Sequence, residues 1–400
     1  MVAGAGFFIW LLGWGTYTPT FGVFVTPLQS EFGWSRADIA LAISFSMIVQ
    51  APLATIAGWL TDKLGPRLVV MTFGSFYGIC YLLLSRVNTI WQFQASYAVL
   101  AAIGISAINI PVMATIARWF VQRRGLMMGI TQSGMGIGGL IFAPFAAWLI
   151  VGYGWRSTYI ILGIITLAGI LLSGLLLKRD PGELGLPADG EGHALAPEGK
   201  NQAQKTETSP MSIKKAARTR QFWIVAGLFF SFGFCRSTFN IHIAPHVQDL
   251  GFTLAQGAAV LAVLNGSSIV GRVGMGRIAD IVGNRTTFMI SYAITAMILI
   301  WGLVATDLWA LYLFGIVFGI GWGAQAVLRF SVTSEVFGGR SLGLLMGIFG
   351  LAEAVAATFG SYFAGYVFDS LGSYQLAFWI GIVLAIAGIV LAWSLKRTRR

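Results

Sequence analysis

The feature that most constrains this chain is a series of apolar segments, each long enough to cross a lipid bilayer. A helix needs about 20 mostly apolar residues to span the hydrocarbon layer, and only helices and closed barrels satisfy their backbone hydrogen bonds there. The sequence therefore predicts an all-α membrane protein with twelve transmembrane helices. Their approximate bounds are 3–29, 38–62, 68–86, 91–118, 125–151, 155–178, 221–248, 256–279, 286–306, 308–333, 341–368 and 374–395.

A long polar stretch divides these segments into two groups of six. Its central part, Asp180 to Pro210, has too few apolar side chains to build a core, so we expect disorder there. It ends in the basic segment SIKKAARTR, which is either a short surface helix or a solvated flank of the next span. We predict an N-terminal six-helix bundle at 1–178, a cytoplasmic linker at 179–220 and a C-terminal six-helix bundle at 221–400.

The distribution of charge gives the orientation of the chain. Charged residues make up 10% of the sequence, against about 25% in a typical soluble domain. If the N-terminus is cytoplasmic, most of the 26 lysines and arginines lie in cytoplasmic segments, and only Arg36, Arg86 and Arg156 lie in outer loops. We therefore predict a multi-pass protein of the cell (inner) membrane with both termini in the cytoplasm. The net charge of +11 then reflects topology, and lipid rather than nucleic acid is the expected partner.

A short motif occurs twice at the same place in the two halves. GWLTDKLGPR follows the second predicted span and GRIADIVGNR follows the eighth, so that glycine, aspartate, glycine and arginine align at an offset of 218. The halves are therefore a parallel repeat, which places a substrate site near the middle of the membrane between them. The aligned residues are Gly58, Asp62, Gly65, Arg67, Gly276, Asp280, Gly283 and Arg285.

One arginine lies inside the eighth predicted span. Asn265, Ser268 and Arg272 are spaced three and four residues apart and share one helical face. An arginine near the bilayer centre costs about 2.5–3.5 kcal/mol on insertion scales. We interpret Arg272 as a fixed positive charge that binds an anion from a water-filled path. The alternative is an arginine that extends its side chain to the headgroups.

Two further residues are candidates for carrying a proton. Glu353 is the one acid deep inside a predicted span, where an unpaired carboxyl is readily protonated. It could equally be a neutral carboxyl that bonds two helices together. His242, in the seventh span, could titrate near neutral pH if Glu353 does not. His246 lies close to the end of that helix, which favours a place at the outer interface.

Several polar residues could line a path between the helices. Asn109 lies beside Pro111 in the fourth span, and Tyr17 lies in the first. Asn240 shares a face with Arg236 in the seventh span. For Asn109 an ordinary hydrogen bond between helices is the alternative, and tyrosine is common in such spans. Arg329, one turn after Gln325 in the tenth span, lies near the inner end, where we expect it to reach the headgroups.

Other site types are excluded by their context. GMGIGG at 134–139 matches a dinucleotide-binding fingerprint, but it lies inside a span with no strand before it. The sequence contains no P-loop, no metal-ligand cluster and no paired nucleophile and base. Neither an enzyme nor a cofactor or metal is therefore expected, and uptake driven by ATP is excluded.

The repeated motif resembles the loop signature of the major facilitator superfamily, and this resemblance covers all the predicted spans. It implies that the motif residues act as a conformational gate. The segment RWFVQRRG from Arg118, followed by spaced small residues up to Gly138, is similar to the fifth-span signature of the monocarboxylate transporter family. The phrase RTRQFW at 218–223 is also typical of that family, with the oxalate–formate antiporters as close cousins.

This resemblance implies roles for particular residues. The family arginine of the eighth span, four residues before a glycine, falls on Arg272, and it is expected to bind the substrate carboxylate. Mammalian members have an aspartate where this chain has Ser268, and a first-span lysine that is absent here, so their proton-coupling scheme does not transfer directly. The family glutamate of the eleventh span falls on Glu353. The antiporters instead have a lysine in that helix, and one fixed cation suits one carboxylate.

These observations predict a secondary active transporter that works by alternating access. The expected activity is proton-coupled symport of small monocarboxylates such as lactate or pyruvate. Arg272, Asn109, Tyr17, Asn240 and Ser268 are the expected substrate-binding residues, and Glu353 or His242 holds the proton. The alternative is a proton-independent carboxylate exchanger of the oxalate–formate type.

Overall fold

The computed structural model describes residues 2–120, 124–178, 216–337 and 342–395. Within these ranges the chain is helical and forms no β-strand. Most of the predicted linker, 179–215, lies outside the described residues. The helices are α1 Val2–Leu12, α2 Trp14–Phe32, α3 Arg36–Leu64, α4 Pro66–Leu84, α5 Ile90–Ala95, the π-helix η1 Ser96–Ala101, α6 Ala102–Trp119, α7 Arg124–Leu175, α9 Arg220–Asp249, α10 Leu254–Val282, α11 Asn284–Gly302, α12 Leu308–Phe337, α13 Leu342–Leu371 and α14 Gln375–Trp393.

The predicted spans coincide with these helices, and the differences have local causes. In the described residues, nine helices are long and apolar enough to cross a membrane, or ten if the bent α3 is one span. This number is below twelve partly because α7 contains two predicted spans, which are separated at Gly154, where φ is 78°. The first predicted span is interrupted at Gly13 and continues as α2, whose prolines and threonines make it less apolar.

The repeated motif has the same backbone geometry in both halves. α3 ends at Gly65, with φ 83° and ψ 157°, and α10 ends at Gly283, with φ 89° and ψ 153°. Glycine adopts positive φ without the steric cost of a Cβ atom. Each glycine therefore ends one helix and starts the next, α4 or α11, in a tight turn.

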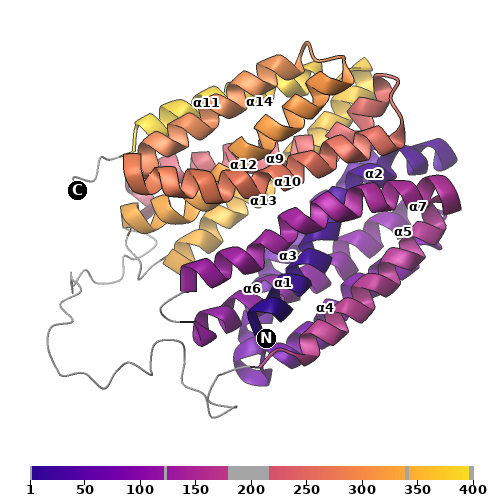
Figure 1. Cartoon of the computed structure of the whole chain (residues 1–400), viewed down its shortest axis with the longest axis horizontal. Coiled ribbons are helices and arrows are strands. Elements are labelled where there is room, and N and C mark those ends of the chain that lie inside the picture. The colour runs from indigo at the N-terminus through magenta and orange to yellow at the C-terminus, as the bar shows by residue number, and fades with distance from the viewer. Residues whose placement is uncertain (1, 121–123, 179–215, 338–341, 396–400) are drawn as a thin grey trace, which may run out of the picture.

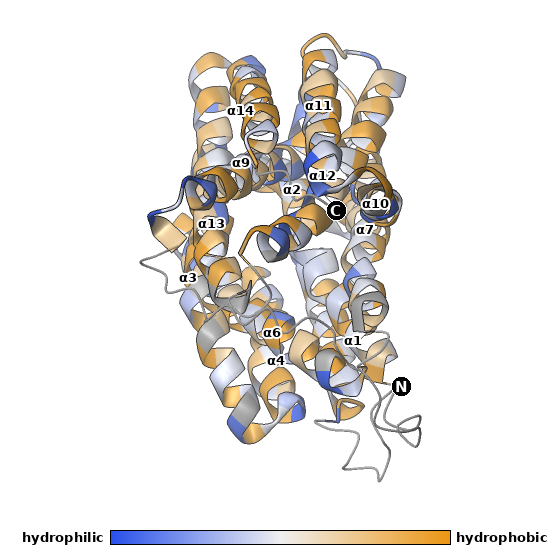
Figure 2. Ribbon diagram, turned by 90° about the vertical axis from the view of Figure 1, so that its left-hand side faces the viewer, coloured by the Kyte–Doolittle hydropathy of each residue, from blue (hydrophilic) through white to orange (hydrophobic). Residues whose placement is uncertain are grey.

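The helices form two bundles that lie side by side. α1 to α7 lie together, and α9 to α14 lie together beside them (Figure 1). The bundles contact each other through α2 with α9, α3 with α13 and α7 with α10. Apolar residues cover most of the helix surfaces, and α9, α11, α12 and α14 lie above α1, α4 and α6 (Figure 2).

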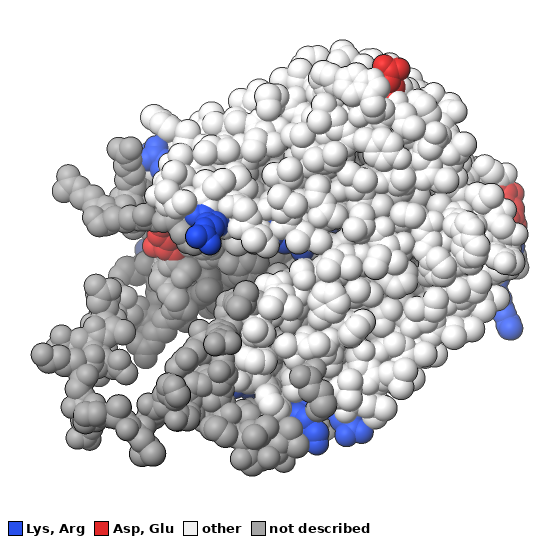
Figure 3. Space-filling view, in the orientation of Figure 1, with Lys and Arg blue, Asp and Glu red and all other residues white. Residues whose placement is uncertain are grey.

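Charged side chains are unevenly distributed over the surface. On the face in Figure 3 they lie toward the two ends of the bundles, with some blue in the crease between the bundles. Outside that crease, a broad belt without charge lies between the ends. Such a belt matches the hydrocarbon layer of a membrane, where an exposed charge is costly.

At one end, which we call the Arg36 end, the two bundles are tied together by Arg36, Asp249, Asp369 and Tyr374. The Arg36 guanidinium donates to both carboxylate oxygens of Asp249, over 2.6 and 2.7 Å. It also donates to the Tyr374 hydroxyl over 2.7 Å. The carboxylate of Asp369 accepts the backbone N–H groups of Arg36 and Ala37, at the N-terminus of α3. These bonds join the start of α3 to the facing ends of α9, α13 and α14.

The close packing of α10 on α12 gives a first testable prediction. A Cβ atom at Gly323 would overlap the backbone carbonyl of Ser268, whereas one at Gly274 would meet nothing within 4 Å. We expect Gly323→Ala to destabilise the protein by about 1–3 kcal/mol through overpacking. Gly274→Ala serves as the control and should be neutral or slightly stabilising, since alanine favours helix. Thermal unfolding in detergent compares the two, and equal melting temperatures would contradict this account of the helix contact.

Candidate functional site

Four charged side chains lie inside the helices of the second bundle. They are Arg236 on α9, Arg272 on α10, Arg329 on α12 and Glu353 on α13. The Glu353 carboxylate pairs with the guanidinium of Arg329, and its other oxygen lies 3.8 Å from Nε of Arg236. Both arginine side chains are almost buried, at 12% and 11% exposure. One carboxylate is thus shared by two arginines.

The position of Arg329 corrects the sequence-based expectation. It does not reach toward the headgroups, because its side chain turns inward to Glu353 and lies over the Phe232 ring, 3.7 Å from the ring centre. Burying a charge is costly unless it is paired. The carboxylate one helix away supplies that partner, and the ring covers the open face of the guanidinium.

Arg272 is placed differently from the other two arginines. Its guanidinium donates to the backbone carbonyl of Gln132 over 3.3 Å, and its other terminal nitrogen is 4.0 Å from the sulfur of Met135. Both residues are on α7, so Arg272 points at the first bundle. The Trp322 ring lies 5.4 Å from the guanidinium carbon. Among the described residues no carboxylate forms an ion pair with Arg272.

The electrostatic consequence is a surplus of positive charge at the contact between the bundles. The charges of Arg329 and Arg236 act on Arg272 and repel it. Glu353 compensates only one of the three arginines. An anion that arrives beside Arg272 would therefore gain a charge-assisted hydrogen bond in a place with little water, where such bonds are strong.

Asn265 and Ser268 precede Arg272 on α10, Asn240 lies on α9, and all three make helix contacts of their own. The Asn240 amide donates to Asn265 over 3.4 Å. Asn265 packs against α7 at Gly139. The Ser268 hydroxyl donates to the Asn265 carbonyl over 2.6 Å and is fully buried. The predicted common face is therefore divided between the contact with α7 and the contact with α12.

Two predicted residues of the first bundle, Tyr17 and Asn109, differ in their surroundings. Tyr17 is buried on α2, accepts a 2.7 Å hydrogen bond from Gln50, and lies within electrostatic reach of Arg236. It therefore faces the cluster across the contact between the bundles. Asn109 is half-buried on α6. It is not among the described residues that contact Arg272, which are Gln132, Met135 and Trp322.

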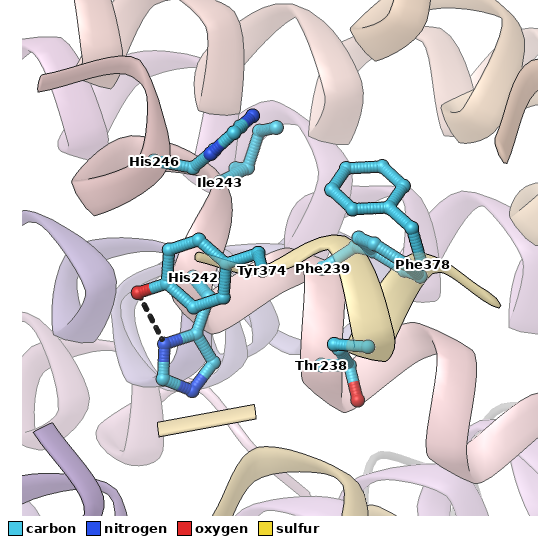
Figure 4. A pocket seen from close by; sticks show the side chains of 8 residues that line it. Thr238, Phe239, His242, Ile243, His246, Tyr374 and Phe378 are labelled. Carbon is cyan, nitrogen blue, oxygen red and sulfur yellow. Dashed lines mark hydrogen bonds between the residues drawn. The ribbon is translucent and has the colours of Figure 1, made fainter. Parts of the chain in front are cut away.

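His242 is not part of the cluster and instead belongs to the Arg36 end. Its Nε2 lies 2.8 Å from the Ser361 carbonyl and its Nδ1 lies 3.2 Å from the Tyr374 hydroxyl. Figure 4 shows the bond to Tyr374, with His246 further along α9 beside the same pocket. Because a carbonyl only accepts, Nε2 must carry the proton. Nδ1 of the neutral ring is then the acceptor for Tyr374.

The predicted gate residues occupy the turns at the opposite end of α3 and α10. Gly58 and Gly276 lie in the last turns of these helices, and Arg285 lies 5.9 Å from the Trp393 ring centre. Arg67 is exposed at the start of α4. The side chains of Asp62 and Asp280 are outside the part of the chain that the structure describes.

Three residues that contact Arg272 were not predicted from the sequence. Gln132 lies in the polar triplet TQS inside an apolar run, which is a signal that could have been used. Met135 follows it one turn later. Trp322 lies between two glycines on α12, and its indole N–H is buried without a hydrogen-bond partner among the described residues. A buried donor of this kind calls for an explanation, and an anion at Arg272 would supply its acceptor.

Comparisons with known proteins agree with this architecture. The family model described as Major Facilitator Superfamily matches residues 3–291 and 267–400. Monocarboxylate transporter 13 of Rattus norvegicus is 29% identical over 97% of the chain and 86% of that protein. The oxalate:formate antiporter of Oxalobacter formigenes is 27% identical over 92% of the chain and 85% of its own length. These relatives are transporters and not enzymes.

A solved structure has the same fold at low sequence identity. It is a bacterial homologue of the human lysosomal transporter Spinster, in an inward-facing and occupied conformation. The TM-score is 0.73, the identity is 14%, and the match covers 98% of the chain and 94% of that structure.

Proposed function

The chain belongs to the major facilitator superfamily of membrane transporters, and we propose that it carries small monocarboxylates of the lactate and pyruvate type together with a proton. Arg272 is the observation that carries this proposal. It is the one of the three clustered arginines without a carboxylate partner among the described residues, and it faces the other bundle. The substrate carboxylate supplies the missing negative charge.

The position of Arg272 suits alternating access. A substrate bound between Arg272 and α7 contacts both bundles, so its release requires them to move apart at one end. Trp322 can donate its indole N–H to the carboxylate and cover the short tail with its ring. Tyr17, Asn109, Asn240 and Ser268 are proposed to line the path, with Tyr17 supported by its place opposite Arg236.

Glu353 is proposed to hold the transported proton. Its carboxylate competes with the substrate for the same group of positive charges, because Arg236 and Arg329 both lie beside it. Protonation of Glu353 frees these arginines, which raises the affinity of the site for an anion. A proton and a monocarboxylate together add no net charge, so the loaded and empty transporters can reorient at similar cost.

A second candidate is a proton-independent carboxylate exchanger. The observation that favours it is the ion pair between Glu353 and Arg329, because the arginine already balances the charge of this carboxylate without a proton. In this case Glu353 remains charged, and one carboxylate replaces another beside Arg272. The relative from Oxalobacter formigenes is an oxalate:formate antiporter, so carboxylate exchange occurs among similar proteins.

The proposal also includes the arrangement of the chain in the membrane. Residues 1–178 and 221–400 form the two six-helix bundles that move relative to each other, and 179–220 connects them on the cytoplasmic side. Both termini then lie in the cytoplasm, and the protein resides in the cell (inner) membrane. The paired turns at Gly65 and Gly283, with Arg67 and Arg285, act as the gate on that side.

Uptake by proteoliposomes separates the two candidates. Purified protein is reconstituted with an alkaline lumen and supplied with radiolabelled lactate outside, with and without a protonophore. We expect lactate to accumulate inside the vesicles against its own concentration gradient. This accumulation should be lost when the protonophore is added. Uptake that does not depend on the pH gradient but requires carboxylate inside the vesicles would show exchange. No uptake in either condition would contradict the substrate assignment.

A further inference from the structure

The hydrogen bonds at the Arg36 end form one continuous chain from a histidine to an ion pair between the bundles. His242 Nε2–H donates to the Ser361 carbonyl, and the Tyr374 hydroxyl donates to His242 Nδ1. The Tyr374 oxygen in turn accepts from Arg36. The Arg36 guanidinium then binds Asp249 through two parallel bonds. In this chain Nδ1 of His242 is the acceptor of the Tyr374 hydroxyl, which is the role of a neutral imidazole.

We infer that His242 is a proton-binding site that unlocks the Arg36 end through Tyr374, so that a proton favours opening at this end. This inference rests on the proposed function only in assuming that the bundles separate during transport. Protonation of Nδ1 removes the acceptor of the Tyr374 hydroxyl. It also places a second positive charge near Arg36, because the Tyr374 oxygen alone separates the imidazole from the guanidinium. Both effects weaken the bonds by which Arg36 holds the bundles together.

Among the described residues, no carboxylate bonds to the His242 ring, so none cancels this effect at the ring itself. On α9 the nearest titratable groups are His246 and Asp249, and Asp249 is already bound to Arg36. α13 contributes the Ser361 carbonyl and Asp369, whose oxygens accept the backbone N–H groups at the start of α3. α14 contributes Tyr374 and α3 contributes Arg36.

Glu31, on α2 at the same end, is an unsuitable sensor. The Arg156 guanidinium and the Trp155 indole N–H donate to its carboxylate and lower its pKa below the usual value. The Glu31 carboxylate therefore stays ionised in the pH range in which a histidine takes up a proton. His242, His246 and Tyr374 together line a small pocket between α9 and α14 (Figure 4).

The sign of the pH dependence follows from linkage. The joined state disfavours the charged imidazole, which lies beside Arg36 and away from water, so the opened state binds the proton more readily. The fraction of open molecules must then rise as the pH falls. For one proton taken up on opening, the ratio of open to joined molecules changes by at most about tenfold per pH unit.

Distance measurements between spin labels test this inference without substrate. Tyr153→Cys and Val304→Cys place labels on exposed positions of the two bundles at the Arg36 end, and the native Cys80 and Cys235 are buried. Between pH 8 and pH 5 we expect longer distances to gain population. In His242→Gln this response should disappear, and in His246→Gln, the matched control, it should persist.

A second variant keeps the test decisive if His242→Gln does not fold. Tyr374→Phe removes the hydroxyl that joins His242 to Arg36, so longer distances should already be populated at pH 8 and should change little with pH. A native pH response in His242→Gln or Tyr374→Phe would overturn the inference, as would its loss in His246→Gln alone. Because no carboxylate is added, failure of lactate transport with this response intact would count only against the proposed function.

Discussion

Arg272→Ala is expected to abolish carboxylate uptake while leaving a folded, membrane-inserted protein. The arginine has no acidic partner among the described residues, so its removal leaves no buried carboxylate unpaired. The substrate carboxylate, in contrast, loses its charged partner. Truncating one member of a buried, hydrogen-bonded charge pair costs about 2–5 kcal/mol, which corresponds to a loss of about 30-fold or more in affinity. Initial uptake rates in proteoliposomes measure the effect.

The control for this variant lies on the same helix. Arg277 is exposed near the end of α10, so Arg277→Ala removes an equal charge without touching the cluster. It should retain most of the native uptake. Arg272→Lys keeps the charge but loses the two-nitrogen fork, and an intermediate rate is expected. Native uptake by Arg272→Ala would show that the carboxylate binds elsewhere.

Glu353→Gln is expected to destabilise the protein and to remove any dependence of uptake on the proton gradient. The change leaves Arg329 and Arg236 almost buried without their carboxylate. Breaking a buried ion pair from one side costs about 3–5 kcal/mol. Glu353 is 20% exposed, so we expect a value of about 3 kcal/mol, at the low end of that range. Thermal unfolding in detergent measures the loss.

The double variant Glu353→Gln with Arg329→Gln provides the control. It removes both charges of the pair, and two neutral amides can bond to each other, so part of the lost stability should return. Equal melting temperatures for native protein and Glu353→Gln would contradict the ion pair. Proton-driven uptake that persists in Glu353→Gln would exclude Glu353 as the proton carrier and would leave His242 as the remaining candidate.

Much of the fold could be predicted from the sequence because the bilayer imposes strict requirements. Apolar length and the offset of 218 between the repeated motifs gave the helices and the paired turns, and Gly65 and Gly283 have nearly the same backbone angles. Arg272 could be singled out because a charge inside an apolar run is costly in any arrangement of helices.

The partners of the charged residues could not be predicted in this way. Arg329 and Glu353 are 24 residues apart on different helices, and their pairing depends on how α12 and α13 are rotated. The bond between Arg36 and Asp249 joins residues 213 positions apart, at the start of α3 and at the end of α9. Helix periodicity predicts the faces of one helix but not which faces of two helices meet. The contact between Trp322 and Arg272 could therefore not be predicted either.

The most direct test of the central claim is equilibrium binding of radiolabelled lactate to purified protein in detergent. Native protein and Arg272→Gln are compared at the same pH, with Arg277→Ala as the reference variant. If Arg272 holds the substrate carboxylate, native protein and Arg277→Ala bind with similar affinity, while the Arg272→Gln dissociation constant rises by about 30-fold or more. Equal affinities in all three proteins would contradict the assignment of Arg272 as the carboxylate site.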